Sequence, residues 1–81
     1  MDAQIAALVA RVIRENTGRE VQLGPDDPLI SSGYLDSMTM VSLILALQTE
    51  FGLQLDLGDM SVANFESVAA IGDLVRSRSA G

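Results

Sequence analysis

The chain has 81 residues, 48% of them hydrophobic and 20% charged, a balance that predicts one small folded domain spanning residues 1–81 rather than a disordered chain. It contains no cysteine and no histidine, which excludes disulfides and thiol nucleophiles and removes the commonest general base and metal ligand. The net charge of −6 argues against nucleic acid as a partner, because phosphate binding requires a basic surface.

The charges are unevenly distributed along the chain. All five basic residues are arginines, at positions 11, 14, 19, 76 and 78, whereas residues 21–75 carry acids only. This field of one sign suits a basic partner surface. For the charge taken alone, we favour the simpler interpretation that the acidity keeps a small domain in solution.

Neither a membrane span nor a secretory signal is apparent in the sequence. The apolar runs are far shorter than the ~20 residues that cross a bilayer. The first residues, MDAQIAALVARVIREN, place an acid and arginines within the pattern, which is unlike a signal peptide. We therefore expect a soluble, monomeric, cytoplasmic protein without membrane insertion.

A first amphipathic helix is predicted near the N-terminus. Its apolar residues follow helical spacing: Ile5, Leu8, Val9, Val12 and Ile13. Asp2 is a possible N-cap, and Gly18 is placed for a left-handed C-terminal cap.

Residues 18–35 are predicted to form a long loop, because they contain repeated glycine, proline and serine turn signals. The loop is too apolar to be a free linker. We expect Leu29, Ile30 and Tyr34 to pack beneath it, and a long loop held by its own side chains is usually functional.

A second helix is predicted over residues 37–51, where no charge occurs before Glu50. One face has core spacing: Met40, Leu43, Ile44, Leu47 and Phe51. Met38, Val41 and Leu45 form a second apolar stripe. Because so short a chain can hardly cover both faces, we favour a partner-facing role for the second stripe over ordinary core packing.

The rest of the chain completes an all-α fold. Residues 53–57 alternate like a strand but have no second strand to pair with, so they are interpreted as an extended connector. Residues 60–64 are expected to form one short helical turn. Ser67 caps a last helix with the core stripe Val68, Ile71, Leu74 and Val75. The prediction is a small four-helix bundle, with three main helices, one short helix and a long loop between helices 1 and 2.

Two smaller expectations accompany this fold. Met60 and Val62 could line a groove for a bound group, but core packing is favoured for both. The polar tail, residues 77–81, is expected to be disordered.

No catalytic or metal-binding constellation is found in the sequence. A serine nucleophile lacks a base, since the chain has neither histidine nor lysine. Asp56 and Asp59 supply too few ligands for a calcium loop. The protein is therefore not expected to be an enzyme. Ser37, at a predicted helix N-terminus, could nevertheless receive a phosphodiester near the positive end of the helix dipole.

The segment LISSGYLDSMTMVSLILALQTEFGLQL, residues 29–55, resembles the central signature of acyl and peptidyl carrier proteins. IAALVARVIREN and NFESVAAIGDLV resemble the opening and closing helices of that family, so the resemblance covers essentially the whole chain. It implies that Ser37 accepts 4'-phosphopantetheine from coenzyme A. The thiol of this arm would carry an acyl group as a thioester, so the missing cysteine is no objection.

The resemblance also implies roles for residues around Ser37. Asp36 would cap the helix and contact the modifying enzyme or its metal. The positions that would meet partner enzymes are Met38, Val41, Ser42 and Leu45. The positions that often carry acids in carriers of bulk fatty-acid synthesis are Thr39, Ser42, Gln48 and Thr49.

This neutral second helix looks more like carriers of aminoacyl or specialised acyl pathways, including D-alanyl carriers. The partners implied are a phosphopantetheinyl transferase, a loading adenylating ligase or acyltransferase, and downstream ketosynthase, condensation or tailoring enzymes. The pathway could be of the fatty-acid, polyketide or nonribosomal-peptide type. The alternative is a non-catalytic helical protein–protein interaction domain without a prosthetic group.

Overall fold

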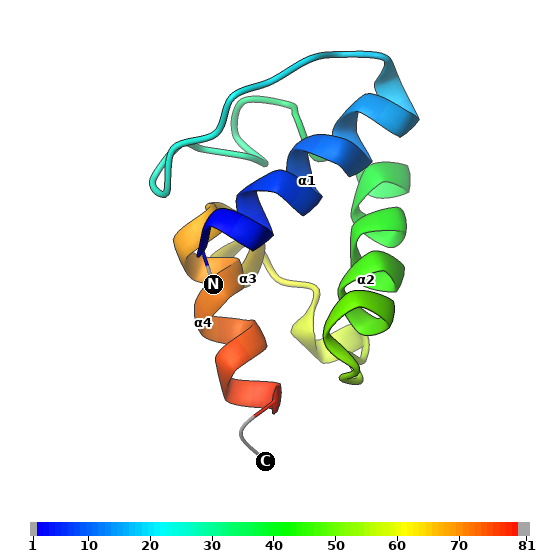
Figure 1. Cartoon of the computed structure of the whole chain (residues 1–81), viewed down its shortest axis with the longest axis vertical. Helices are drawn as coiled ribbons and strands as arrows, with labels where there is room; N and C mark the ends of the chain where they lie inside the picture. Colours follow the sequence, from blue (N-terminus) through cyan, green and yellow to red (C-terminus); the bar gives the residue numbers. More distant parts are fainter. Residues whose placement is uncertain (1, 80–81) are drawn as a thin grey trace.

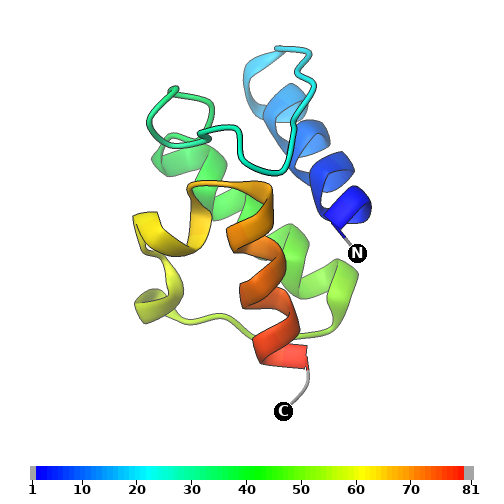
Figure 2. The same cartoon turned by 90° about the vertical axis from the view of Figure 1, so that its left-hand side faces the viewer.

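The computed structural model describes residues 2–79, which form a helical bundle without strands in that range (Figures 1 and 2). The helices are α1 (Asp2–Thr17), α2 (Ser37–Phe51), α3 (Val62–Phe65) and α4 (Val68–Ser79), with a 3-10 turn η1 (Leu57–Asp59) before α3. A long loop crosses one end of the bundle between α1 and α2. This arrangement confirms the predicted fold class.

Helix α1 buries the predicted stripe and ends where expected. Its five stripe residues are all buried. Gly18 adopts a φ of 76° and its amide donates to the Arg14 carbonyl over 2.8 Å, which closes the helix as a left-handed cap. The helix already includes Asp2. The side chain of Asp2 lies outside the described part of the structure, so its capping role stays a prediction.

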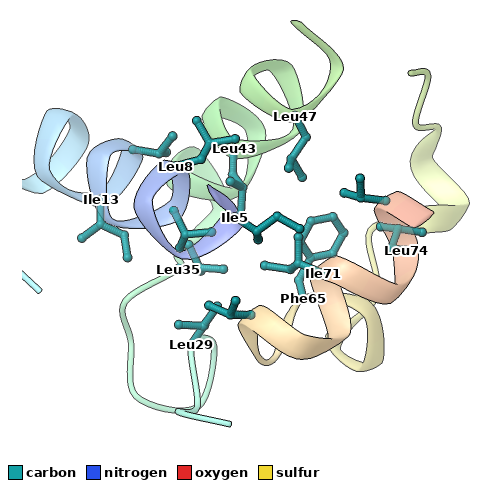
Figure 3. Packing of buried hydrophobic residues seen from close by; sticks show 14 of the residues in the cluster. Ile5, Leu8, Ile13, Leu29, Leu35, Leu43, Leu47, Phe65, Ile71 and Leu74 are labelled. Carbon is teal, nitrogen blue, oxygen red and sulfur yellow. The ribbon is translucent and has the colours of Figure 1, made fainter. Parts of the chain in front are cut away.

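The core lies where all four helices and the long loop meet. Figure 3 shows Ile5, Phe65 and Ile71 approaching one another at its centre, and all three are fully buried. Leu43 and Leu47 fill the α2 side, whereas Met40, Ile44 and Phe51 of the same predicted face are only partly buried.

The long loop is fastened to the junction between α3 and α4. The Leu29 amide donates to the Glu66 carbonyl over 2.7 Å, while the amide and hydroxyl of Ser31 both donate to the Glu66 carboxylate at 3.1 Å. Leu29 is fully buried, and Ile30 and Tyr34 pack partly buried against the core. The prediction that these three residues pack beneath the loop is confirmed.

The segment between α2 and α4 departs from the sequence prediction in its detail. Residues 53–56 form neither helix nor strand, as expected of a connector, but Leu57 of the predicted connector begins η1. The turn predicted at 60–64 corresponds to α3, which starts two residues later, at Val62. Ser61 explains the late start of α3, because its hydroxyl accepts from the Asn64 amide and caps that helix. Met60 therefore belongs to a connector rather than to a helix.

Helix α4 begins as predicted and ends later than predicted. The Ser67 hydroxyl accepts from the Ala70 amide at 3.1 Å, and all four stripe residues of α4 are buried. The helix continues to Ser79, so residues 77–79 of the tail predicted to be disordered are helical, and Ala80 and Gly81 lie outside the described residues. Within residues 2–79, no helix is long and apolar enough to cross a membrane.

Candidate functional site

Asp36 fixes the point where α2 begins. Its backbone is extended, with φ −93° and ψ −176°, and its Oδ1 accepts the Thr39 amide at 2.8 Å. This is the N-cap geometry that satisfies an otherwise unpaired amide of the first helical turn. The same hydrogen bond holds the pKa of the Asp36 carboxyl below its ordinary value, so the carboxylate is ionised at neutral pH.

Ser37 is the first residue of α2 and is exposed, as are Asp36 and Met38. This exposed segment, residues 36–38, lies between two buried residues, Leu35 with 4% of its surface exposed and Thr39 with 1%. A carboxylate in place of Thr39 would enter the core, so this position does not suit the acid that the resemblance implies for carriers of bulk fatty-acid synthesis.

An open apolar groove runs from Ser37 along α2, and we call it the α2 groove. It consists of two hollows, of about 450 Å³ and 410 Å³, that share Val41 and Met60. The apolar side chains around the first hollow are Ile30, Leu35, Met40, Val41, Met60 and Val62. Ile44, Leu45 and Leu55 line the second hollow.

The structure corrects the preference for core packing at Met60 and Val62. Val62 is 59% exposed and Met60 is only partly buried, and both line the α2 groove beside Ser37. Core packing was favoured from the sequence because both residues are apolar. The sequence could not show that the connector before α3 holds them at the edge of the α2 groove.

The second stripe of α2 is a surface. Met38, Val41 and Leu45 are 77%, 51% and 57% exposed, so ordinary core packing is wrong for all three. Ser42 is partly buried, and its hydroxyl donates to Asn16 Oδ1 of α1 at 3.1 Å. The contact of these four residues with partner enzymes stays a prediction.

Charges within the groove are of one sign. Of the residues that line its two hollows, only Asp36 and Asp56 are charged, and both are acidic. The position of Asp56 beside α2 was not predicted, because nothing in the sequence brings it next to that helix. The contact that does so is the Leu55 amide donating to Gln48 Oε1 over 2.9 Å. Over the described residues, no group of three or more His, Cys, Asp or Glu residues is placed to hold a metal ion.

The chain matches the family model described as "Phosphopantetheine attachment site" over residues 3–75. It belongs to this family of phosphopantetheine-binding carrier proteins. The carrier resembles D-alanyl carrier protein 2 of Lactiplantibacillus plantarum, with 31% identity over 67 residues that cover 83% of this chain and 84% of the relative. D-alanyl carrier protein 1 of the same organism is also 31% identical, over 80% of this chain and 81% of the relative.

Solved structures agree with this family assignment. The carrier matches a chain in the crystal structure of Bradyrhizobium japonicum glycine:[carrier protein] ligase complexed with its cognate carrier protein and an analogue of glycyl adenylate, with a TM-score of 0.77 and 25% identity over 95% of this chain and 96% of that one. The complex of the same ligase with glycylated carrier protein gives a TM-score of 0.74 and 25% identity, over 90% and 95%.

The family fixes the class of protein and its prosthetic group. The protein is a non-catalytic carrier, similar to D-alanyl and other aminoacyl carriers, and its cofactor is covalently attached 4'-phosphopantetheine. This replaces the alternative of an interaction domain without a prosthetic group. The described residues fit such a group, because an exposed serine hydroxyl opens onto an unfilled apolar groove.

Proposed function

We propose that Ser37 carries the phosphopantetheine arm and that the arm holds an aminoacyl group as a thioester. The observation that carries this proposal is the free hydroxyl of Ser37, which makes no hydrogen bond within the described residues. The hydroxyls of five other serines are engaged in hydrogen bonds: Ser31, Ser32, Ser42, Ser61 and Ser67. Ser37 is thus both exposed and unoccupied at the mouth of the α2 groove.

Attachment needs a partner enzyme, because the chain has no histidine or lysine to accept the proton. The Ser37 oxygen forms a bond to the phosphorus that bears pantetheine in coenzyme A. The pyrophosphate bond breaks, the adenosine bisphosphate leaves, and a base of the phosphopantetheinyl transferase takes the hydroxyl proton. When attached, the arm supplies the thiol that forms the thioester. Asp36 presents a fixed carboxylate beside Ser37 for the transferase or its metal.

The charge of the groove supports an aminoacyl cargo. Its only charged lining residues are Asp36 and Asp56, so the ammonium of an aminoacyl thioester is attracted and the carboxylate of a malonyl-type thioester is repelled. The relatives named D-alanyl carrier proteins and the carrier glycylated by its ligase agree with this cargo class. We therefore propose an adenylating ligase as the loading partner, ahead of an acyltransferase.

The attachment site is tested by intact mass after incubation with coenzyme A and a broad-specificity phosphopantetheinyl transferase. We expect the wild type and the control Ser31→Ala to gain one phosphopantetheine, and Ser37→Ala to gain none. A wild-type mass that stays unchanged while a known carrier is modified contradicts the proposal. So does modification of Ser37→Ala.

The cargo class is tested on the protein bearing the arm. It is incubated with ATP and adenylating ligases for glycine or D-alanine, and separately with a malonyl transferase and malonyl-coenzyme A. We expect an aminoacyl mass gain with at least one ligase and a much slower malonyl transfer. Efficient malonyl loading without any aminoacyl loading contradicts an aminoacyl carrier.

A further inference from the structure

One wall of the α2 groove is joined to α4 by an ion pair. This wall consists of residues 54–64, which include η1 and the start of α3. Among the described side chains of this stretch, only that of Asp59 is buried. Leu55 packs partly buried against the core, and Asp59 is the buried polar anchor of this wall, so the position of the wall depends in part on what holds Asp59.

Asp59 is held by Arg78 from the last turn of α4. Arg78 Nη2 donates to Asp59 Oδ1, and Arg78 Nε donates to Oδ2 over 3.3 Å. The Asp56 amide also donates to Oδ2, at 3.1 Å. Both carboxylate oxygens are thus occupied in a two-pronged contact, which fixes orientation as well as distance. Figure 2 shows α3 and the preceding turn beside α4, the two parts that this contact joins.

The backbone of Asp59 transmits this position to the groove. Its carbonyl accepts the Ser61 amide at 3.0 Å and Asn64 Nδ2 at 3.1 Å, which sets the start of α3. Met60, directly next in the chain, lines both hollows of the α2 groove. A movement of Asp59 must therefore change the place where the two hollows join.

We propose that the Arg78–Asp59 ion pair is a positioning contact. It holds the wall formed by residues 54–64, including Met60, against α4 and thereby sets the width of the α2 groove. Its consequence for the arm and the cargo rests on the proposed function of Ser37. The fastening of the wall does not depend on it, because all of its contacts lie in the protein without the arm. Arg78 acts through Asp59 and Met60 and makes no contact with the reacting atoms.

The fastening is tested by amide hydrogen exchange on the protein without the arm. In Arg78→Gln we expect amides of residues 56–62 to exchange about tenfold or more faster than in the wild type, through local opening. The exchange rates of amides in α1 and α2 should be the same as in the wild type. Arg78→Lys, which keeps the charge, should recover part of the protection. Arg14→Gln is the matched control, because Arg14 pairs with Glu20 at the surface and lies outside the α2 groove.

Two outcomes would overturn the proposal. Wild-type exchange of residues 56–62 in Arg78→Gln would mean that the wall is held by something else. An equal acceleration in α1, α2 and residues 56–62 would mean that the ion pair only stabilises the whole fold. Neither outcome depends on whether Ser37 is modified, so failure here is separate from failure of the proposed function.

The consequence for the groove is tested by the Met60 methyl resonance before and after attachment of the arm. We expect a shift in the wild type and in Arg14→Gln, and a shift below about half of that value in Arg78→Gln, because the wall spends less time in place. A shift in Arg78→Gln equal to that of the wild type would overturn the role of the ion pair in the groove. If the mass test shows no modification of Ser37, the proposed function has failed and only the exchange result bears on the fastening.

Discussion

At the scale of single residues, one side chain creates the geometry of the site. Asp36 Oδ1 accepts the Thr39 amide, so Asp36 is the N-cap and α2 begins at the next residue, Ser37, which is exposed. These two positions were predictable from the sequence because capping is a local interaction between neighbours in the chain. The burial of Thr39 was not predictable in the same way, because it depends on which elements pack over the first turn of α2.

The capping and charge roles of Asp36 can be separated by two substitutions. Asn retains an oxygen that can accept the Thr39 amide, so Asp36→Asn should keep nearly the wild-type melting temperature, whereas Asp36→Ala should lower it by several degrees. If the transferase or its metal needs the carboxylate, both variants should be modified more slowly. Circular dichroism and the initial rate of mass gain measure the two effects. Equal destabilisation by Asn and Ala would contradict the capping role.

The buried carboxylate of Asp59 should give part of the stability a defined dependence on pH. The hydrogen bond from Arg78 holds the pKa of Asp59 below its ordinary value of 3.8. A lowered pKa in the folded state means that the contribution is complete above the unfolded-state pKa and is lost as the pH falls through the folded-state value. The gap in unfolding free energy between the wild type and Asp59→Asn should be constant near neutrality and should close below about pH 4.

Urea unfolding of both proteins at a series of pH values measures this gap. Asp73→Asn is the control, because Asp73 pairs with Arg76 at the surface of α4, the helix that also carries Arg78. Such surface pairs contribute little to stability. A gap between the wild type and Asp59→Asn that stays constant throughout the acid range would show that ionisation of Asp59 is not what stabilises the fold.

At the scale of elements, α2 serves two surfaces at once. Leu43 and Leu47 are fully buried in the core, while Met38, Val41 and Leu45 remain exposed. Helical spacing was enough to predict both stripes. It did not predict the wall opposite α2, because the Asp59–Arg78 pair joins residues 19 positions apart and one of them lay in a segment expected to be disordered.

Charges placed on the exposed stripe should weaken partner binding without unfolding the helix. Val41→Asp and Leu45→Asp each introduce a charge that must be desolvated when a loading enzyme covers the stripe. We expect kcat/KM for loading to fall about tenfold or more, as for a residue central to an interface. The far-ultraviolet circular dichroism and the melting temperature should stay close to those of the wild type.

Thr49→Asp is the matched control for these variants, because Thr49 is exposed on the same helix and lies outside the stripe. It should load at close to the wild-type rate. Unfolding of Val41→Asp or Leu45→Asp would place those residues in the core, and unchanged loading would remove the stripe from the partner interface.

At the scale of the whole molecule, one core is assembled from distant segments. Phe65 of the four-residue α3 is fully buried, and it meets side chains of α1 and α4 at the centre of Figure 3. The three main helices were predictable from periodicity, since each buries a regular stripe. The division between η1 and α3 was not, because elements this short are fixed by their tertiary contacts rather than by a repeating pattern.

Truncation of Phe65 tests how far this small core depends on its centre. Phe65→Ala should cost about 3–5 kcal/mol, a large fraction of the roughly 5–15 kcal/mol that stabilises a small domain. Chemical denaturation should therefore show a much lower free energy of unfolding and a lower denaturant midpoint than the wild type. Val62→Ala is the control on the same helix, since Val62 is 59% exposed. Its free energy of unfolding should be close to that of the wild type. A loss of unfolding free energy in Phe65→Ala as small as that in Val62→Ala would contradict the central position of Phe65 in the core.

The surroundings of Ser37 also have a chemical consequence. Of the four methionines in a chain without cysteine, Met38 is the neighbour of Ser37 and Met40 and Met60 line the hollow beside it. Thioethers are flexible and polarizable, which lets such a surface adapt to groups of different shape. They are also readily oxidised to polar sulfoxides. In the protein before the arm and its thiol are attached, mild peroxide should therefore act on these methionines of the carrier surface, so that attachment and later loading are slowed while the helical fold persists, and methionine sulfoxide reductases should restore both.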